Sequence, residues 1–177
     1  MVTSGDVLEH PVTREKIIIR KTARDTGGEL FQADLYLQPG AFVAAEHIHP
    51  LQEERFEIIA GTLRGRVAGR EFASGPGESV VVPKGAPHVW WNAGDQELHC
   101  LVDLRPALRI ESFFETFFGL AQDGKVSPKI VLARPPRLVQ TLLFGALAPL
   151  GRLLGYTGTH TRMSGRRRLD RGASAPV

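Results

Sequence analysis

The sequence predicts an all-β fold, an antiparallel sandwich or barrel, followed by a C-terminal α-helical extension. Two observations lead to this fold class. Short segments rich in β-branched and aromatic residues follow one another between turns that contain Gly or Pro, which is typical of antiparallel β-proteins. After Pro106 the apolar residues recur instead at steps of three and four, which is the period of an amphipathic helix.

The expected strands follow one another through the first 105 residues. Residues 14–22 contain three consecutive isoleucines, which favour extended structure. Residues 29–37 follow a Gly-Gly turn and alternate, with apolar side chains at every second position from Phe31 to Leu37. Gly61 and Thr62 favour a hairpin. The complete expectation is 14–22, 29–37, a strand from Gly40 toward His49, 54–59, 63–68, 71–73, 79–82, 87–91 and 97–104.

Two helices are expected beyond Pro106. The first carries an apolar stripe at residues 108, 110, 113, 114, 117, 118 and 121, and Gly124 would end it. The second begins at Pro135 and Pro136, because proline is tolerated in a first helical turn, and extends toward Leu150. We expect this extension, residues 106–160, to pack against the exterior of the barrel or against its partner. A lid, a dimerisation arm and a membrane-surface contact remain alternatives.

Three histidines are candidate metal ligands. His47 and His49 are two residues apart, and an extended strand points both side chains of such a pair to one face. His88 follows a Pro-x-Gly turn at Pro83 and Gly85, and therefore arrives from a later strand. Imidazole nitrogens bind several divalent transition metals, so the three residues together predict a metal site.

A carboxylate is expected to complete this site. Pro50 ends regular pairing after the histidines, and the next strand can then bring Glu53 or Glu54 beside them. Glu54 is preferred because it shares strand parity with Phe56 and Ile58, and apolar parity marks the inward face of a half-buried strand. The resulting nitrogen and oxygen ligands suit one Fe, Mn, Ni, Cu or Zn ion per chain.

Two motifs of the chain resemble those of the cupin superfamily, in particular its single-domain, type-2 conserved barrel proteins. The first motif, a glycine, HxH, a glutamate and a closing glycine, is matched by Gly40, His47, His49, Glu54 and Gly61. The second, GxxxxxPxGxxHxxxN, is matched by Gly77, Pro83, Gly85, His88 and Asn92. One departure is that six residues rather than five separate Gly40 from His47, which implies a small bulge or a shifted turn.

The resemblance spans roughly residues 30–105 and implies a jelly-roll β-barrel that binds metal through His47, His49, Glu54 and His88. We therefore expect residues 1–105 to form the barrel, with motif 1 at about 40–61 and motif 2 at about 77–92, and residues 161–177 to form a basic, disordered tail.

The resemblance also implies a small organic molecule as substrate or ligand. We expect a metal-dependent dioxygenase or an isomerase/cyclase, and the alternative is a small-molecule-binding or sensory protein without turnover. Phe42, Phe56 and Trp90 are candidates for the pocket wall. His99 and Asp103 share one strand parity and Cys100 has the other, so one of these two sets points inward. The substrate, the reaction and the identity of the metal are not indicated by the sequence.

Composition limits the remaining possibilities. A chain of 177 residues with 42% hydrophobic residues can bury one core, so we expect a single globular domain apart from its extension. The net charge of +3 includes Arg166, Arg167, Arg168 and Arg171 of the tail, so it gives no reason to expect nucleic-acid binding. A single cysteine and the lack of a signal-peptide pattern favour the cytoplasm. We expect a homodimer and no membrane association.

Overall fold

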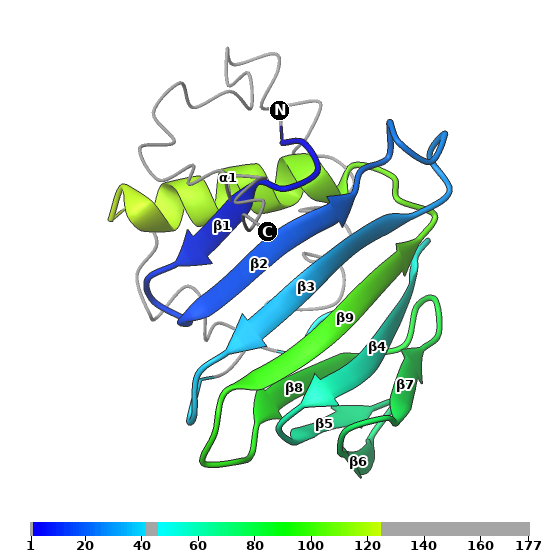
Figure 1. The fold of residues 1–177 in the computed structure, drawn as a ribbon. Helices are drawn as coiled ribbons and strands as arrows, with labels where there is room; N and C mark the ends of the chain where they lie inside the picture. Colours follow the sequence, from blue (N-terminus) through cyan, green and yellow to red (C-terminus); the bar gives the residue numbers. More distant parts are fainter. Residues whose placement is uncertain (1, 42–45, 125–177) are drawn as a thin grey trace, which may run out of the picture.

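The computed structural model describes residues 2–41 and 46–124, and within them it shows nine strands and one helix (Figure 1). The strands are β1 (Val7–His10), β2 (Glu15–Lys21), β3 (Phe31–Leu37), β4 (Glu53–Ala60), β5 (Leu63–Val67), β6 (Arg70–Ser74), β7 (Ser79–Val82), β8 (His88–Asn92) and β9 (Leu98–Arg105), and the helix is α1 (Ile110–Gln122). The all-β fold with a C-terminal helix is therefore confirmed. The helix expected from Pro135 and the basic tail lie outside the described residues.

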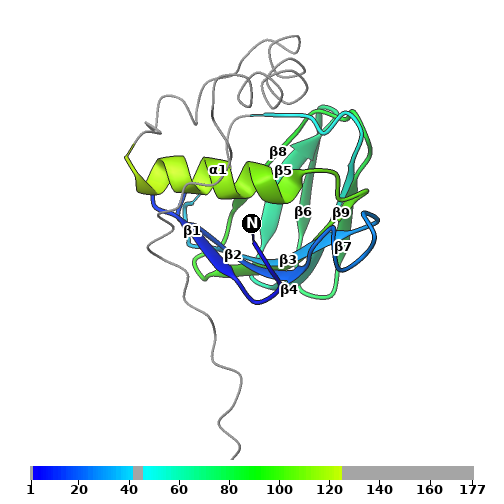
Figure 2. The same ribbon diagram turned by 90° about the horizontal axis from the view of Figure 1, so that it is seen from above.

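The strands form two antiparallel sheets that face each other (Figures 1 and 2). The larger sheet has the order β1-β2-β3-β9-β4-β7, and the smaller has the order β6-β5-β8. Neighbouring strands are in most cases far apart in the sequence, as in the central β3-β9-β4 unit. This is the jelly-roll sandwich that the strand pattern and the two motifs predict.

The core lies between the sheets and follows from strand alternation. In one row across the large sheet, Ile17 pairs with Leu35, Leu35 with Cys100, and Cys100 with Ile58. All four side chains are buried, whereas His99 and its neighbours of the same parity face outward. Cys100 therefore belongs to the inward-facing set of β9, and His99 to the outward-facing set. Burial in this core raises the pKa of Cys100 to about 12.

Helix α1 completes the core on the side that the smaller sheet leaves uncovered (Figure 2). It runs along the inner side of the large sheet beside β1, where Phe117 and Phe118 pack on the ring of His10 at centroid distances of 4.7 and 5.1 Å. Phe114 packs on Phe31 at 5.7 Å. The helix therefore lies over the inner face of the sheet rather than on its outer face.

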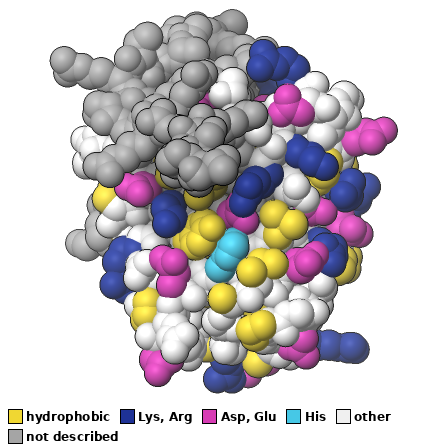
Figure 3. Space-filling model, in the orientation of Figure 1, with side chains coloured by type: hydrophobic (Ala, Val, Ile, Leu, Met, Phe, Trp, Pro, Cys, Tyr) yellow, Lys and Arg dark blue, Asp and Glu magenta, His cyan; other side chains and the backbone are white. Residues whose placement is uncertain are grey.

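The outer face of the large sheet, seen in Figure 3, has a mixed surface. Acidic and basic side chains are interspersed on it, and hydrophobic side chains gather around one histidine near its middle. Among the described residues, no helix is both long and apolar enough to cross a membrane.

Two segments differ from the expected strands. Strand β1 was not expected, although Val7 to His10 alternate in burial and pair with β2. The strand expected to lead into His49 is reduced, in the residues described after position 45, to an isolated bridge between His47 and His88. Pro50 explains the lack of a longer ladder beyond the bridge, because its nitrogen carries no hydrogen to donate.

Gly61, which closes the first motif, provides a test of the packing. Its φ is +80°, and a Cβ at this position would lie 2.8 Å from the Cα of Leu98 and 2.9 Å from the carbonyl oxygen of Glu97. Gly69 has a similar φ of +82°, but a Cβ there would meet nothing within 4 Å. Gly61 is therefore required both for backbone conformation and for close approach of β9, and Gly69 for conformation alone.

We expect Gly69→Ala to lower the free energy of unfolding by about 1–2 kcal/mol, the cost of a left-handed backbone with a side chain. Gly61→Ala should lower it by about 2–5 kcal/mol, because a clash with a neighbouring backbone adds roughly 1–3 kcal/mol. Urea denaturation of both variants measures the difference. Equal losses of unfolding free energy in the two variants would show that β9 can move away from position 61 without an energetic cost.

Candidate functional site

The two motifs of the sequence meet in the structure through their backbones. The N–H of His47 donates to the carbonyl oxygen of His88 and the N–H of His88 to that of His47, both at 2.9 Å. The N–H of Gly85 also donates to the carbonyl oxygen of His49 at 2.9 Å. Gly85 has a φ of +74°, which glycine adopts without strain. The turn before β8 therefore holds His88 beside the histidine pair.

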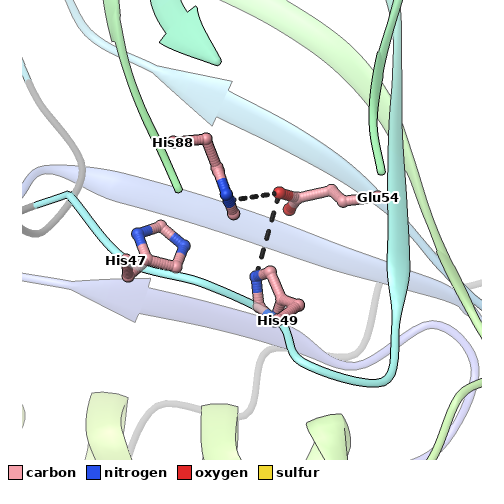
Figure 4. A group of neighbouring side chains, drawn as sticks. All are labelled: His47, His49, Glu54 and His88. Carbon is pink, nitrogen blue, oxygen red and sulfur yellow. Dashed lines mark ion pairs between the residues drawn. The ribbon is translucent and has the colours of Figure 1, made fainter. Parts of the chain in front are cut away.

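Four side chains converge at this junction, as Figure 4 shows. One potential ligand atom from each of His47, His49, Glu54 and His88 lies within 4.8 Å of the others. Oε2 of Glu54 is 3.0 Å from Nε2 of His88 and 3.9 Å from Nε2 of His49. His88 and Glu54 are buried and the other two are half-buried, so the cluster opens toward His47 and His49.

Orientation of His88 is set by a backbone group. Its Nδ1 lies 3.0 Å from the carbonyl oxygen of Ala86, so this nitrogen carries a hydrogen and donates it. Nε2 then points a lone pair toward Oε2 of Glu54, and neither of these two buried atoms has a hydrogen-bond partner. Two buried acceptors at this distance are favourable only with a proton or a cation between them. The residues therefore fit a bound metal ion.

Electrostatics of the cluster favour the charged carboxylate. Burial acts to raise the pKa of Glu54, but the neighbouring imidazoles of His88 and His49 outweigh it and leave the pKa below its ordinary value. Burial acts to lower the pKa of His88, and the nearby Glu54 outweighs it, so this pKa is raised. The pKa of His49 is lowered, chiefly by burial. A proton on His88 would consequently compete with a metal ion.

The structure also places the other residues considered from the sequence. Glu54 points inward, and Glu53, its neighbour on the other face of β4, is outside the cluster. Phe56 and Trp90 are buried in the core and pack edge to face at 5.2 Å, each two residues along its strand from Glu54 or His88. Phe42 lies outside the described residues.

Sequence reasoning missed several buried polar residues, among them His10, Glu15 and Gln52. Each alternates with buried neighbours, as Gln52 does with Glu54, but this signal does not show which distant segments cover the side chains. His10 and Glu15 line an open pocket of about 570 Å³ at the turn between β1 and β2. Its lining includes none of the four residues of the cluster.

Residues 34–102 match the family model of the cupin domain. The chain carries a cupin domain. No curated protein matches the sequence. Among solved structures, an RmlC-like cupin from Shewanella frigidimarina is 16% identical with a TM-score of 0.51, covering 63% of this chain and 93% of its own. A predicted oxalate decarboxylase from Thermotoga maritima is 19% identical with a TM-score of 0.50, covering 52% of this chain and 80% of its own. At such identities the two likenesses concern the fold alone.

Asn92, the last residue of the second cupin motif, has a structural role. Its Nδ2 donates to the carbonyl oxygens of Leu37 at 2.8 Å and Gln96 at 2.7 Å, and its Oδ1 accepts from the N–H of Gly94 at 2.9 Å. These bonds hold the connection from β8 to β9 against β3. The asparagine therefore supports the cupin barrel and lies outside the candidate metal cluster.

Proposed function

We propose that the chain is a metal-dependent enzyme that acts on a small organic molecule, with dioxygenase or isomerase/cyclase chemistry. The observation that carries the proposal is the convergence of three imidazoles and one carboxylate, with ligand atoms within 4.8 Å, inside the cupin domain. His47, His49, Glu54 and His88 would hold one Fe, Mn, Ni, Cu or Zn ion. Such an ion polarises a substrate oxygen as a Lewis acid, and iron or copper adds redox chemistry with dioxygen.

The protein's own residues supply the binding geometry and the surroundings. Glu54 contributes a negative charge that a cation requires, and Ala86 fixes His88 with Nε2 free for coordination. Phe56 and Trp90 lie on the same strand faces as Glu54 and His88, and their rings form apolar surroundings next to these ligands. Exclusion of water by such side chains strengthens electrostatic interactions within a site. The half-buried His47 and His49 lie on the side from which a small molecule would approach.

Metal loading followed by a search for turnover tests the proposal. The protein is purified without chelator, and its metal content is measured by mass spectrometry. Stripped protein is then reloaded with each of the five metals and incubated with small molecules that carry two neighbouring oxygens, with and without dioxygen. We expect about one metal per chain and a metal-dependent product, which His49→Ala abolishes.

His99→Ala is the matched control, because His99 faces outward and bonds Asp34 at 2.8 Å on the other side of the sheet. Turnover should survive this change. Binding of a small molecule to the metal-loaded protein without any product would favour the sensory alternative. Protein that retains no metal after loading would contradict both functions. A homodimer stays a prediction for the assembly.

A further inference from the structure

Two pairs of side chains connect the two sheets in the interior, one pair next to the other. Glu54 of β4 faces His88 of β8, with Oε2 and Nε2 3.0 Å apart, as Figure 4 shows. Two positions further along the same strands, Phe56 packs on Trp90 with ring centroids 5.2 Å apart. Side chains two positions apart on a strand share a face and are spaced by roughly 7 Å. Trp90 is therefore the next interior side chain of β8 after the candidate ligand His88.

The indole group of Trp90 has a donor without an acceptor. Trp90 is 5% exposed, and its Nε1 is buried with no hydrogen-bond partner in the part of the chain that the structure describes. An indole nitrogen can only donate, and a buried tryptophan usually finds an acceptor for it. An unsatisfied buried donor destabilises the folded state, so such atoms are rare in proteins. The Trp90 N–H therefore requires a partner that is not one of the described residues.

Atoms of this kind are concentrated at one place in the interior. Within residues 2–41 and 46–124, the buried side-chain atoms without a partner are Oε2 of Glu54, Nε2 of His88, Nε1 of Trp90 and Nε2 of His10. The first three belong to the two neighbouring pairs of β4 and β8, and His10 belongs to β1. A cation between Glu54 and His88 would satisfy two of the three atoms. A cation accepts no hydrogen bond, so Trp90 requires a second group with a lone pair.

We propose that Trp90 is a specificity-determining residue of the metal site, whose indole N–H donates to an oxygen of the molecule that the metal binds. This inference rests on the proposed metal-dependent function. It narrows the substrate class to molecules with acceptor oxygens at two positions, one for the metal and one for Trp90, as in a short dicarboxylate. The competing interpretation is that Trp90 only fills the core against Phe56 and donates to a trapped water.

The first experiment compares acetate, malonate and succinate as probes of the Zn(II)-loaded protein by calorimetric titration. We expect one of the two dicarboxylates to bind more tightly than acetate, which has a single carboxylate. Trp90→Phe keeps an aromatic ring against Phe56 and removes the N–H. It should weaken binding of that dicarboxylate by about 10- to 100-fold, the usual effect of losing a hydrogen bond to a charged group, and leave acetate binding unchanged.

Trp91→Phe is the matched control. It is the same substitution at the adjacent position, where the half-buried side chain lies on the opposite face of β8. Its affinity for all three probes should equal that of the wild type. Both variants should also bind Zn(II) as the wild type does, because neither tryptophan is a metal ligand. Circular dichroism verifies that each variant is folded before its affinities are compared.

Wild-type affinity for the dicarboxylate in folded Trp90→Phe would overturn the inference and leave the metal site intact. The inference would equally fail if the wild-type protein bound neither dicarboxylate more tightly than acetate. Failure of the wild type to bind Zn(II) would overturn the proposed function and the inference together. These failures are distinguishable, because Zn(II) loading is measured before any probe is added.

A second measurement follows the N–H of Trp90 directly. The chain has two tryptophans, so ¹⁵N-labelled protein gives two indole N–H signals, which the spectrum of Trp91→Phe assigns. When the dicarboxylate is added to the Zn(II)-loaded wild type, we expect the indole proton of Trp90 to move downfield and that of Trp91 to stay in place. A Trp90 signal that does not move at saturating dicarboxylate would overturn the inference even if Trp90→Phe does not fold.

Discussion

Replacing Glu54 with glutamine is expected to lower the affinity for a divalent metal by about two to four orders of magnitude. Glu54 is the one carboxylate of the cluster, is 6% exposed, and has its pKa held below the ordinary value by the imidazoles around it. Removing one member of a buried charge pair costs about 3–5 kcal/mol. Each 1.4 kcal/mol is roughly tenfold in a dissociation constant. Calorimetric titration with Zn(II) measures the loss.

Glu53→Gln is the control for this prediction. Glu53 is adjacent in the sequence, belongs to the same strand and has the same charge, but its side chain is on the opposite face. Its substitution should leave the affinity within about twofold, because a half-buried charge on the other face of the strand lies outside the cluster. Similar losses in the two variants would mean that net charge, rather than a ligand at position 54, accounts for binding.

The pH dependence of metal binding follows from the same pair. The pKa of His88 is raised in the metal-free cluster, with burial opposing and Glu54 favouring the protonated form. A proton on Nε2 excludes a metal, so affinity should fall as pH decreases through this raised pKa. In Glu54→Gln the favourable partner of the protonated form is gone, and the fall should move to lower pH.

Strand parity allowed much of the fold and of the cluster to be predicted from the sequence. Burial alternates through most of β3, β4 and β9, with Asp34 and Asp103 as buried exceptions, and this alternation was sufficient to choose Glu54 over Glu53 as the inward residue. The presence of glycine in the motifs also has a physical explanation, since the backbone of Leu98 leaves no room for a side chain at Gly61. The alternation of side chains along a strand was informative where that strand alone determines which of its side chains are buried.

Parity could not predict features that depend on distant segments. The side chain of Gln52 donates to carbonyl oxygens more than 50 positions away, at Pro106 and Ala107. Placement of α1 depends on the unequal widths of the two sheets, which no local pattern reports. His10 belongs to β1, at the edge of the large sheet, and Phe117 and Phe118 of α1 cover its ring.

Glu15, in β2 beside this edge strand, is also buried, and Glu15→Gln is expected to stabilise the protein at alkaline pH. Burial, opposed by the hydroxyl of Thr13 donating at 2.6 Å and supported by the negative charge of Glu54, raises the pKa of Glu15 from 4.5 to about 7. The folded state therefore keeps a proton between these pH values that the unfolded state has lost. Stability from this group is fully present below pH 4.5 and is lost as pH rises to about 7.

The rise in pKa corresponds to about 3 kcal/mol, at roughly 1.36 kcal/mol per pKa unit. At pH 8 glutamine should recover up to about 3 kcal/mol in the free energy of unfolding, because it is neutral and its oxygen can still accept from Thr13. Near pH 4.5 the variant and the wild type should be almost equally stable. Urea denaturation of chelator-treated protein at both pH values measures this difference.

Glu57→Gln serves as the reference, since the side chain of Glu57 is 42% exposed and pairs with Arg55 on the outer face. We expect Glu57→Gln to change the free energy of unfolding by less than about 0.5 kcal/mol at either pH, as for most surface substitutions. A gain in Glu15→Gln that is the same at pH 4.5 and pH 8 would show that titration of Glu15 is not its cause. A gain restricted to the alkaline side would support a Glu15 carboxyl group that is buried, with a raised pKa, in the folded protein in solution.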